Sequence, residues 1–208
     1  MKKFILSIDQ GTTGTTALII NKDNFKLVAK HNEEFPQIFP KPGWVEHNLN
    51  DIWDTVGISI QKVLKKSNIS KNDIYSIGIT NQRETTCAYS KSGRPLANAI
   101  VWQDRRTSDF CIEKKETYQK LKLKTGLPLD PYFSATKMNW LLENNDDVKE
   151  AKQNDDLLFS TIDTFLLYKL TNSKKFKTEA SNASRTLLMD LDTCKWDKDL
   201  LHFFEIDS

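Results

Sequence analysis

The segment SIDQGTTGTTALII, Ser7 to Ile20, decides how this chain begins to fold. An apolar run leads into Asp9, a short stretch of glycine and threonine follows, and a second apolar, β-branched run ends the segment. Gly11 and Gly14 permit a tight reversal and a close approach of backbone to backbone. The pattern therefore predicts two neighbouring strands joined by a turn, with Asp9 at the tip of the first strand.

The same turn has the composition of a phosphate site. Successive backbone N–H groups in a turn form a concave anion site, and threonine hydroxyls add neutral donors. Asp9 would repel a phosphate but suits a Mg²⁺ ion that the phosphate carries, because Mg²⁺ prefers oxygen ligands. An ordinary hairpin with a surface aspartate explains these residues equally well. The turn is not a P-loop, because no Gly-Lys-Thr follows it and the next element is a strand.

Apolar patterns along the next part of the chain predict alternating strands and helices. A third strand is expected at FKLVAK (25–30), and a helix with one apolar side is expected to begin at Asn48 or Asn50. Buried-type strands are expected at IYSIGIT (74–80) and DDLLFSTI (155–162). Together with the two strands of the opening segment, these three strands make five.

Other segments predict the connections between these strands. Residues 86–102 read as a hairpin whose turn is SKSGRP, and residues 105–124 read as a helical zone. Ser134 is expected to cap a following helix, and Asp163 or Thr164 the helix after that. The end of the chain, from SRTLLMD onward, predicts a strand, a turn and an amphipathic helix.

This element order predicts an α/β domain with a mixed five-stranded sheet and flanking helices. By analogy, the arrangement is that of the ribonuclease H-like domain found in actin, Hsp70 and sugar kinases. We expect residues 1–208 to form one such domain. A fold by itself does not give a function.

Composition narrows the classes of partner and compartment. The net charge of +2 argues against nucleic acid or an anionic membrane as the main partner. The chain has no apolar run of membrane-spanning length, and Asp9 interrupts the N-terminal apolar run too early for a signal peptide. A cytoplasmic location is the resulting expectation. Cys87, Cys111 and Cys194 are odd in number and far apart, which suggests neither a disulfide framework nor a zinc site.

Longer motifs give a more specific signal than composition. The chain contains, in this order, DQGTTGT, PKPGWVEHN, IGITNQRETT, NAIVWQDRRT, DPYFSATK, STIDTFLLYKLT and TNSKKFKTEASNASRTLLMDLDTCKWD. Together these segments closely resemble the FGGY carbohydrate kinase family, and NQRETT with PKPGWVEH points to its glycerol kinase branch. The resemblance covers essentially the whole chain. It implies ATP-dependent transfer of a phosphoryl group to a terminal hydroxyl of glycerol.

The resemblance assigns four residues to the glycerol site. Arg83 and Glu84, in NQRETT, resemble the pair that hydrogen-bonds the glycerol hydroxyls, and Tyr132 in DPYFS resembles a tyrosine with the same role. Trp102, in IVWQ, resembles the indole against which the glycerol carbons pack. A guanidinium donates, a carboxylate accepts and a phenol does either, which suits a polyol. Taken singly, these residues would also fit a surface ion pair and core aromatics.

The resemblance also assigns ATP and Mg²⁺ as cofactors. Asp9 resembles the aspartate that the family associates with Mg²⁺. The resemblance places the following residues at the nucleotide phosphates: Gly11, Thr12, Thr13, Gly14 and Thr16. Two of these depart from the pattern, because glycerol kinases commonly have serine and arginine where this chain has Gly14 and Thr16. Since threonine carries no positive charge, we expect either a lower affinity for the nucleotide or a lysine supplied from elsewhere.

Proteins of this family are much longer than 208 residues. The resemblance implies that the general-base aspartate, a second phosphate loop and the adenosine pocket lie beyond Ser208. We therefore expect this chain to bind ATP together with a C-terminal domain and to be inactive, or nearly so, alone. Two alternatives remain open: a non-catalytic module that binds glycerol or nucleotide, and an actin-like scaffold. An apolar face left uncovered by that domain would favour a homodimer.

Overall fold

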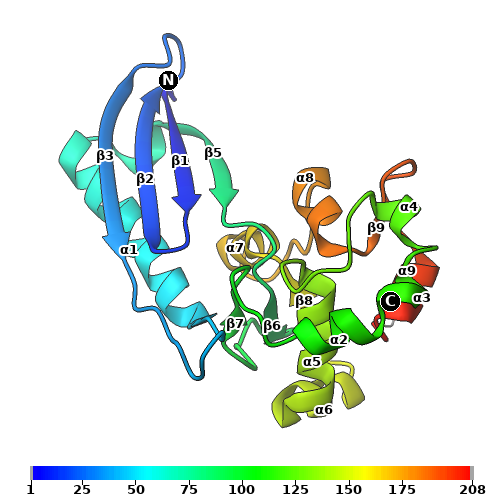
Figure 1. The fold of residues 1–208 in the computed structure, drawn as a ribbon. Helices are drawn as coiled ribbons and strands as arrows, with labels where there is room; N and C mark the ends of the chain where they lie inside the picture. Colours follow the sequence, from blue (N-terminus) through cyan, green and yellow to red (C-terminus); the bar gives the residue numbers. More distant parts are fainter. Residues whose placement is uncertain (1, 207–208) are drawn as a thin grey trace. The chain divides into compact units, whose positions relative to one another are not determined.

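The computed structural model describes residues 2–206 and divides into two compact units (Figure 1). The first unit comprises Met1–Gln37 and Asn48–Gln82, and the second comprises Ile38–His47 and Arg83–Ser208. No helix among the described residues is both long enough and apolar enough to cross a membrane. Each unit has its own core and is described separately below.

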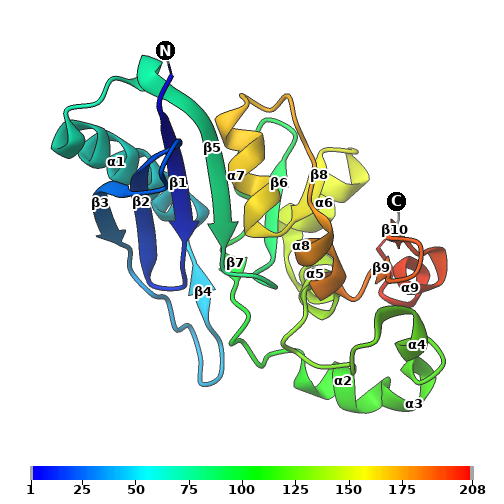
Figure 2. The ribbon, with the colours of Figure 1, turned by 90° about the horizontal axis from the view of Figure 1, so that it is seen from above.

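The first unit is a mixed sheet with one long helix packed on it (Figures 1 and 2). The sheet has four strands in the order β3-β2-β1-β5. Strands β1 and β2 pair antiparallel, as do β2 and β3, whereas β1 and β5 pair parallel. The elements are β1 (Phe4–Gln10), β2 (Gly14–Asn21), β3 (Leu27–Glu34), α1 (Leu49–Ser67) and β5 (Ile74–Asn81).

Helix α1 begins where its sequence predicts. Asn48 is the N-cap, and its side chain accepts a hydrogen bond from the backbone N–H of Asn50. The helix buries Ile52, Val56 and Val63 and packs against β2 and β3. Each aliphatic side chain of this kind contributes about 1.5–3 kcal/mol when it is removed from water. The predicted cap and apolar side of this helix are therefore confirmed.

The prediction of a five-stranded sheet is wrong in its strand count. The expected fifth strand, β8 (Leu157–Ser160), belongs to the second unit and pairs antiparallel with β6 (Cys87–Ser90). A short apolar run shows that a segment is a buried strand, but it carries no information on which strand it pairs with. Within the described residues, β5 is consequently an edge strand, with Tyr75 63% exposed and Ile77 51% exposed.

The second unit is mostly helical, with three two-stranded sheets. Helix α5 (Ser134–Asn144) is its central element and has seven buried residues. The other elements are β4 (Glu46–His47), β6, β7 (Ala99–Ile100), α2 (Ser108–Glu113), α3 (Lys115–Tyr118), α4 (Lys122–Thr125), α6 (Asp146–Gln153), β8, α7 (Ile162–Leu170), α8 (Ala180–Ala183), η2 (Ser184–Thr186), β9 (Met189–Asp190), β10 (Lys195–Trp196) and α9 (Lys198–Phe203).

Several local predictions for this unit are confirmed and others are corrected. The hairpin at 86–102 forms, with Ser90 N–H donating to the Arg94 carbonyl at its turn. The terminal strand, turn and helix form as β9, β10 and α9. The helical zone at 105–124 is confirmed and consists of three short helices, α2, α3 and α4.

The two expected helix caps of this unit are corrected. Ser134 is the first residue of α5 rather than its cap, and its hydroxyl donates 3.0 Å to the Glu84 carbonyl oxygen. Helix α7 starts at Ile162, so Asp163 and Thr164 lie inside its first turn. In both places a hydroxyl or carboxylate finds a partner outside the cap position, which a sequence pattern does not reveal.

The three cysteines are free thiols: Cys87 and Cys111 are buried and Cys194 is exposed. Burial raises the pKa of the Cys111 thiol to about 12 and that of Cys87 further still. Both buried thiols therefore stay protonated and chemically inert near neutral pH.

Candidate functional site

Glu84 occupies a strained position in the turn that follows β5. Its backbone φ is +62°, a left-handed conformation that non-glycine residues adopt at a cost of about 1–3 kcal/mol. Its carbonyl oxygen accepts hydrogen bonds from the hydroxyls of Ser134 at 3.0 Å and Thr86 at 3.4 Å. The backbone of Glu84 is therefore held from helix α5, and its side chain is only 3% exposed.

The Glu84 carboxylate is paired with Arg185. The Nε–H of Arg185 donates to Oε1 of Glu84 at 2.6 Å, across 101 residues of sequence. A buried carboxylate without a partner is costly, and a nearby guanidinium offsets that cost. A carboxylate has two acceptor oxygens, and Arg185 engages one of them.

The guanidinium of Arg185 also packs on two aromatic rings. Its Cζ lies 4.9 Å from the centroid of the Phe133 ring and 5.7 Å from that of Tyr132. The Tyr132 ring in turn meets Trp102, with ring centroids 5.6 Å apart at an interplanar angle of 61°. Glu84, Tyr132 and Trp102 are therefore linked in one run of contacts, and Arg185 joins the first two.

The loop that carries Tyr132 is fixed from both sides. The backbone N–H of Tyr132 donates 2.8 Å to Asp130 Oδ1, and Arg105 Nη1 donates 3.0 Å to the same oxygen. The Nζ of Lys137 donates 2.7 Å to the Tyr132 carbonyl oxygen and 3.2 Å to that of Phe133. Lys137 is fully buried, and burial lowers the pKa of its ammonium to about 7.

The four residues assigned to the polyol differ in exposure. Arg83 is exposed, Trp102 and Tyr132 are half-buried, and Glu84 is buried. The second unit thus places a buried acceptor beside half-buried aromatic side chains, next to an exposed guanidinium in sequence. A small molecule with several hydroxyls and an apolar carbon edge matches this set of groups.

The Gly/Thr turn of the first unit is tight and well anchored. The Gly11 N–H donates to the Gly14 carbonyl oxygen at 2.9 Å. Gln82 binds the base of the turn, with its N–H donating 2.7 Å to the Gln10 carbonyl and its Nε2 donating 3.0 Å to Gln10 Oε1. Thr12 is half-buried and Thr13 exposed, so the tip of the turn is open to a ligand.

Gly14 lies where only glycine fits without a shift of the backbone. A Cβ atom at this position would sit 2.6 Å from the Glu33 carbonyl oxygen and 3.1 Å from the Glu34 Cα. Thr16 donates its hydroxyl to Asn32 Oδ1 at 2.9 Å. Both residues lie beside strand β3, since Gly14 pairs with Glu34 and Thr16 with Asn32.

Asp9 is exposed at the end of β1, opposite Thr16 on β2 and Thr80 on β5. The described residues contain no group of three or more His, Cys, Asp or Glu side chains that could hold a metal ion. The roles that the resemblance assigns to Asp9, Arg83 and Glu84 stay predictions.

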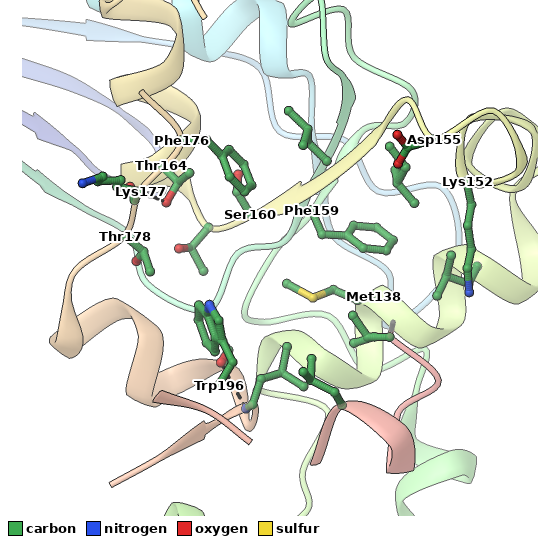
Figure 3. Close-up of a pocket in the computed structure, with 18 residues that line it drawn as sticks. Met138, Lys152, Asp155, Phe159, Ser160, Thr164, Phe176, Lys177, Thr178 and Trp196 are labelled. Atoms are coloured by element: carbon green, nitrogen blue, oxygen red, sulfur yellow. Dashed lines mark hydrogen bonds between the residues drawn. The ribbon is translucent and has the colours of Figure 1, made fainter. Parts of the chain in front are cut away.

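A cavity of about 710 Å³ lies elsewhere in the second unit (Figure 3). The side chains that line it include the apolar groups of Met138, Phe159, Phe176 and Trp196. Charged side chains such as Lys152 also line it (Figure 3). None of the residues assigned to the polyol lines it.

Sequence reasoning missed two residues that shape this site. Arg185 and Lys137 both lie inside motifs quoted above, SNASRTLLMD and DPYFSATK, but nothing local to either motif indicates a role. A lone arginine or lysine is usually a solvated surface charge. The burial of Lys137 and the long-range partner of Arg185 are visible only in three dimensions.

Comparisons with known proteins place these residues in a family context. The family model "FGGY family of carbohydrate kinases, N-terminal domain" matches residues 4–208. The glycerol kinase of Listeria monocytogenes serotype 4a (strain HCC23) is 50% identical over 208 residues, covering 99% of this chain and 42% of that protein. The glycerol kinase of Bacillus subtilis (strain 168) is 49% identical over 204 residues, covering 97% of this chain and 41% of that protein. This chain thus spans about 42% of the length of the first of these relatives.

Solved structures confirm the predicted α/β fold. The crystal structure of Plasmodium falciparum glycerol kinase with ADP matches with a TM-score of 0.87 and 36% identity, covering 98% of this chain and 41% of that chain. The gluconate kinase from Lactobacillus acidophilus matches with a TM-score of 0.85 and 26% identity, covering 99% of this chain and 40% of that chain.

Proposed function

Because this chain belongs to the FGGY family of carbohydrate kinases, we propose that it is the glycerol-binding part of an ATP-dependent glycerol kinase. The observation that carries the proposal is the near-complete coverage of this chain, at 50% identity, by a glycerol kinase. The run of contacts among Glu84, Arg185, Tyr132 and Trp102 supports it, because it gathers groups that suit a small polyol. Phosphorylation itself is proposed for a longer protein, since the relatives extend well beyond the matched region.

Each residue assigned to glycerol has a role that follows from its chemistry. Arg83 donates to a hydroxyl oxygen, Glu84 accepts from a hydroxyl, and Tyr132 does either. Trp102 offers an aromatic face to the carbon edge. A site with such paired groups rejects analogues that lack a hydroxyl, because a buried polar group is then left without its partner.

For the nucleotide, we propose that the Gly/Thr turn holds the phosphates of ATP. The turn backbone and the hydroxyls of Thr12 and Thr13 would donate, and the absence of a side chain at Gly11 would let the phosphates approach closely. The fit to Mg²⁺ is that of an ion carried by the nucleotide, because Asp9 is a lone exposed carboxylate. Mg²⁺ is commonly bound by one or two carboxylates plus phosphate oxygens and water. When bound, it supplies charge neutralisation at the transferring phosphoryl group.

Two further proposals concern the cellular location of this chain and its self-association. We propose a cytoplasmic location, which suits the three free thiols of this chain.

We also propose that the isolated chain forms a homodimer, because Tyr75 and Ile77 are exposed on edge strand β5. Analytical ultracentrifugation of the wild type and the Ile77→Lys variant tests the dimer, and an unchanged monomer in both would contradict it.

Calorimetric titration of this chain with glycerol tests the proposed function. Wild type is expected to release heat that saturates, and propane-1,2-diol is expected to bind at least tenfold more weakly. Arg83→Ala removes a charged donor, whose hydrogen bond is worth about 1.5–3 kcal/mol, so the Kd should rise at least tenfold. The matched control is Arg94→Ala, another exposed arginine of the same unit, which should leave the Kd unchanged. Saturable binding that ignores Arg83→Ala would place glycerol elsewhere.

A further inference from the structure

Arg185 contacts two of the three side chains proposed to bind glycerol hydroxyls, Glu84 and Tyr132. Its Nε–H donates to Glu84 Oε1 at 2.6 Å, and its Cζ lies 5.7 Å from the centroid of the Tyr132 ring. The contact through Nε leaves the two terminal nitrogens of the fork for other partners. One guanidinium therefore relates the position of the carboxylate to that of the phenol.

The backbone that carries Arg185 is itself well fixed. Glu179 caps helix α8 by accepting from the backbone N–H groups of Ser181 and Asn182. Thr186, which follows Arg185, donates its hydroxyl to the Ala183 carbonyl oxygen at 2.7 Å and is buried. The guanidinium thus projects from a rigid turn rather than from a free loop.

The backbone of Glu84 is equally constrained, which leaves the carboxylate as the part still to be oriented. Its φ of +62° and the 3.0 Å hydrogen bond from Ser134 fix where the side chain starts. A buried ion pair is a poor way to gain stability, because well-packed apolar residues often do as well or better. The presence of a buried carboxylate paired with Arg185 is explained better by a requirement for the orientation of that carboxylate.

We propose that Arg185 is a positioning residue of the polyol site, which holds Glu84 so that one carboxylate oxygen stays directed at the substrate. The inference rests on the proposed function. Arg185 acts through Glu84 and the Tyr132 ring and is not assigned a contact with glycerol. Lysine cannot reproduce this role fully, because an ammonium lacks the planar fork that both donates and stacks.

A double-mutant cycle on glycerol binding tests the inference. The variants are Glu84→Gln, Arg185→Met, Arg185→Lys and the double variant Glu84→Gln/Arg185→Met. Methionine keeps an apolar stem against Phe133, so packing is largely retained. Arg185→Met is expected to raise the Kd for glycerol at least tenfold, and Arg185→Lys to restore part of that loss. If Arg185 acts through Glu84, the double variant binds no more weakly than the weaker single variant.

The outcomes separate this inference from the proposed function. If wild type binds glycerol and Arg185→Met binds it equally well, or if the two substitutions are simply additive, the inference is overturned and the proposed function stands. If wild type does not bind glycerol, the proposed function fails. In that case urea unfolding of the same four variants measures whether Glu84 and Arg185 are energetically coupled. If the loss in free energy of unfolding of the double variant equals the sum of the losses of the two single variants, the inference is overturned. Arg94→Met serves as the control, with no expected change in either measurement.

Should Arg185→Met fail to fold because it leaves a buried carboxylate unpaired, the cycle still decides through the other variants. The double variant removes both charges and so avoids that penalty. Lysine keeps the charge but loses the fork, so a wild-type Kd in a folded Arg185→Lys variant would count against a role in orientation.

Discussion

The Nζ of Lys137 donates a 2.7 Å hydrogen bond to the carbonyl oxygen of Tyr132, and this lysine is fully buried. A charged group at the foot of the loop that presents Tyr132 makes the loop sensitive to the protonation of Lys137. Burial lowers the pKa of Lys137 to about 7, against the opposing effect of the nearby carboxylates of Asp104 and Glu84.

The first prediction concerns the pH dependence of stability that Lys137 creates. Its pKa is about 7 in the folded chain and 10.5 ordinarily, so between these values the unfolded chain binds more protons. The contribution of Lys137 to the free energy of unfolding therefore rises as the pH increases above about 7, with a slope of up to about 1.4 kcal/mol per pH unit. Urea unfolding of wild type and Lys137→Met from pH 7 to 8.5 measures the difference in slope. Parallel curves would show that Lys137 titrates normally.

A second prediction concerns His47, which is fully buried in strand β4 and whose pKa burial lowers to about 4. Between pH 6.5 and 4 the unfolded chain binds the extra proton, so stability falls as the solution becomes more acid. Thermal unfolding across this range should show a smaller acid loss in His47→Gln than in wild type. An equal acid loss in the two proteins would assign the effect to carboxylates instead. We assign His47 no chemical role.

A third prediction follows from the close approach of Gly14 to strand β3. Gly14→Ser places a Cβ 2.6 Å from the Glu33 carbonyl oxygen unless β3 moves. We expect a loss of about 1–3 kcal/mol in the free energy of unfolding. Gly78→Ser is the matched control, because Gly78 is also in a strand and has nothing within 4 Å of its Cβ position. Chemical denaturation of both variants checks the contrast, and equal losses would contradict it.

A fourth prediction compares two neighbouring arginines of the second unit. The Arg106 side chain is 2% exposed, donates to Glu46 at 2.7 Å and to Asp104 at 2.9 Å, and lies 3.8 Å from the Trp44 ring centroid. Arg106→Lys keeps the charge but loses the fork and the stacking, so we expect a loss of about 2–3 kcal/mol.

Arg105→Lys is the control for this comparison, because Arg105 pairs with Asp130 at the surface, with side chains 52% and 45% exposed. An exposed pair of this kind contributes at most about 1 kcal/mol. Urea denaturation measures both variants. If Arg105→Lys proves as harmful as Arg106→Lys, burial is not what distinguishes the two arginines.

The sequence predicted the first unit well because its signals are local. Apolar runs mark β1 and β2, and Asn48 is a strong N-cap, so strands and helix follow from neighbouring residues. The partner of β8 could not be predicted, because pairing depends on residues far away in sequence. The predicted cap at Ser134 is wrong for the same reason, because its hydroxyl bonds to Glu84, which is distant in sequence.

The candidate site shows the same division between local and distant information. The family resemblance drew attention to Arg83, Glu84, Trp102 and Tyr132 through short motifs around each residue. No local pattern connects Glu84 to Arg185, since the contact depends on the turn geometry of both segments. The sequence does not indicate the roles of Arg185 and Lys137, because their partners are distant in sequence and their burial depends on the whole unit.

The 101 residues between Glu84 and Arg185 also bear on the order of events during biosynthesis. A ribosome releases Glu84, Trp102 and Tyr132 before Arg185 has been made. Until that residue emerges, the Glu84 carboxylate has no cation to accompany it out of water, so the turn around it should close late. A nascent chain interrupted ahead of Arg185 would hold every residue that the motifs assign to glycerol and still lack an assembled pocket.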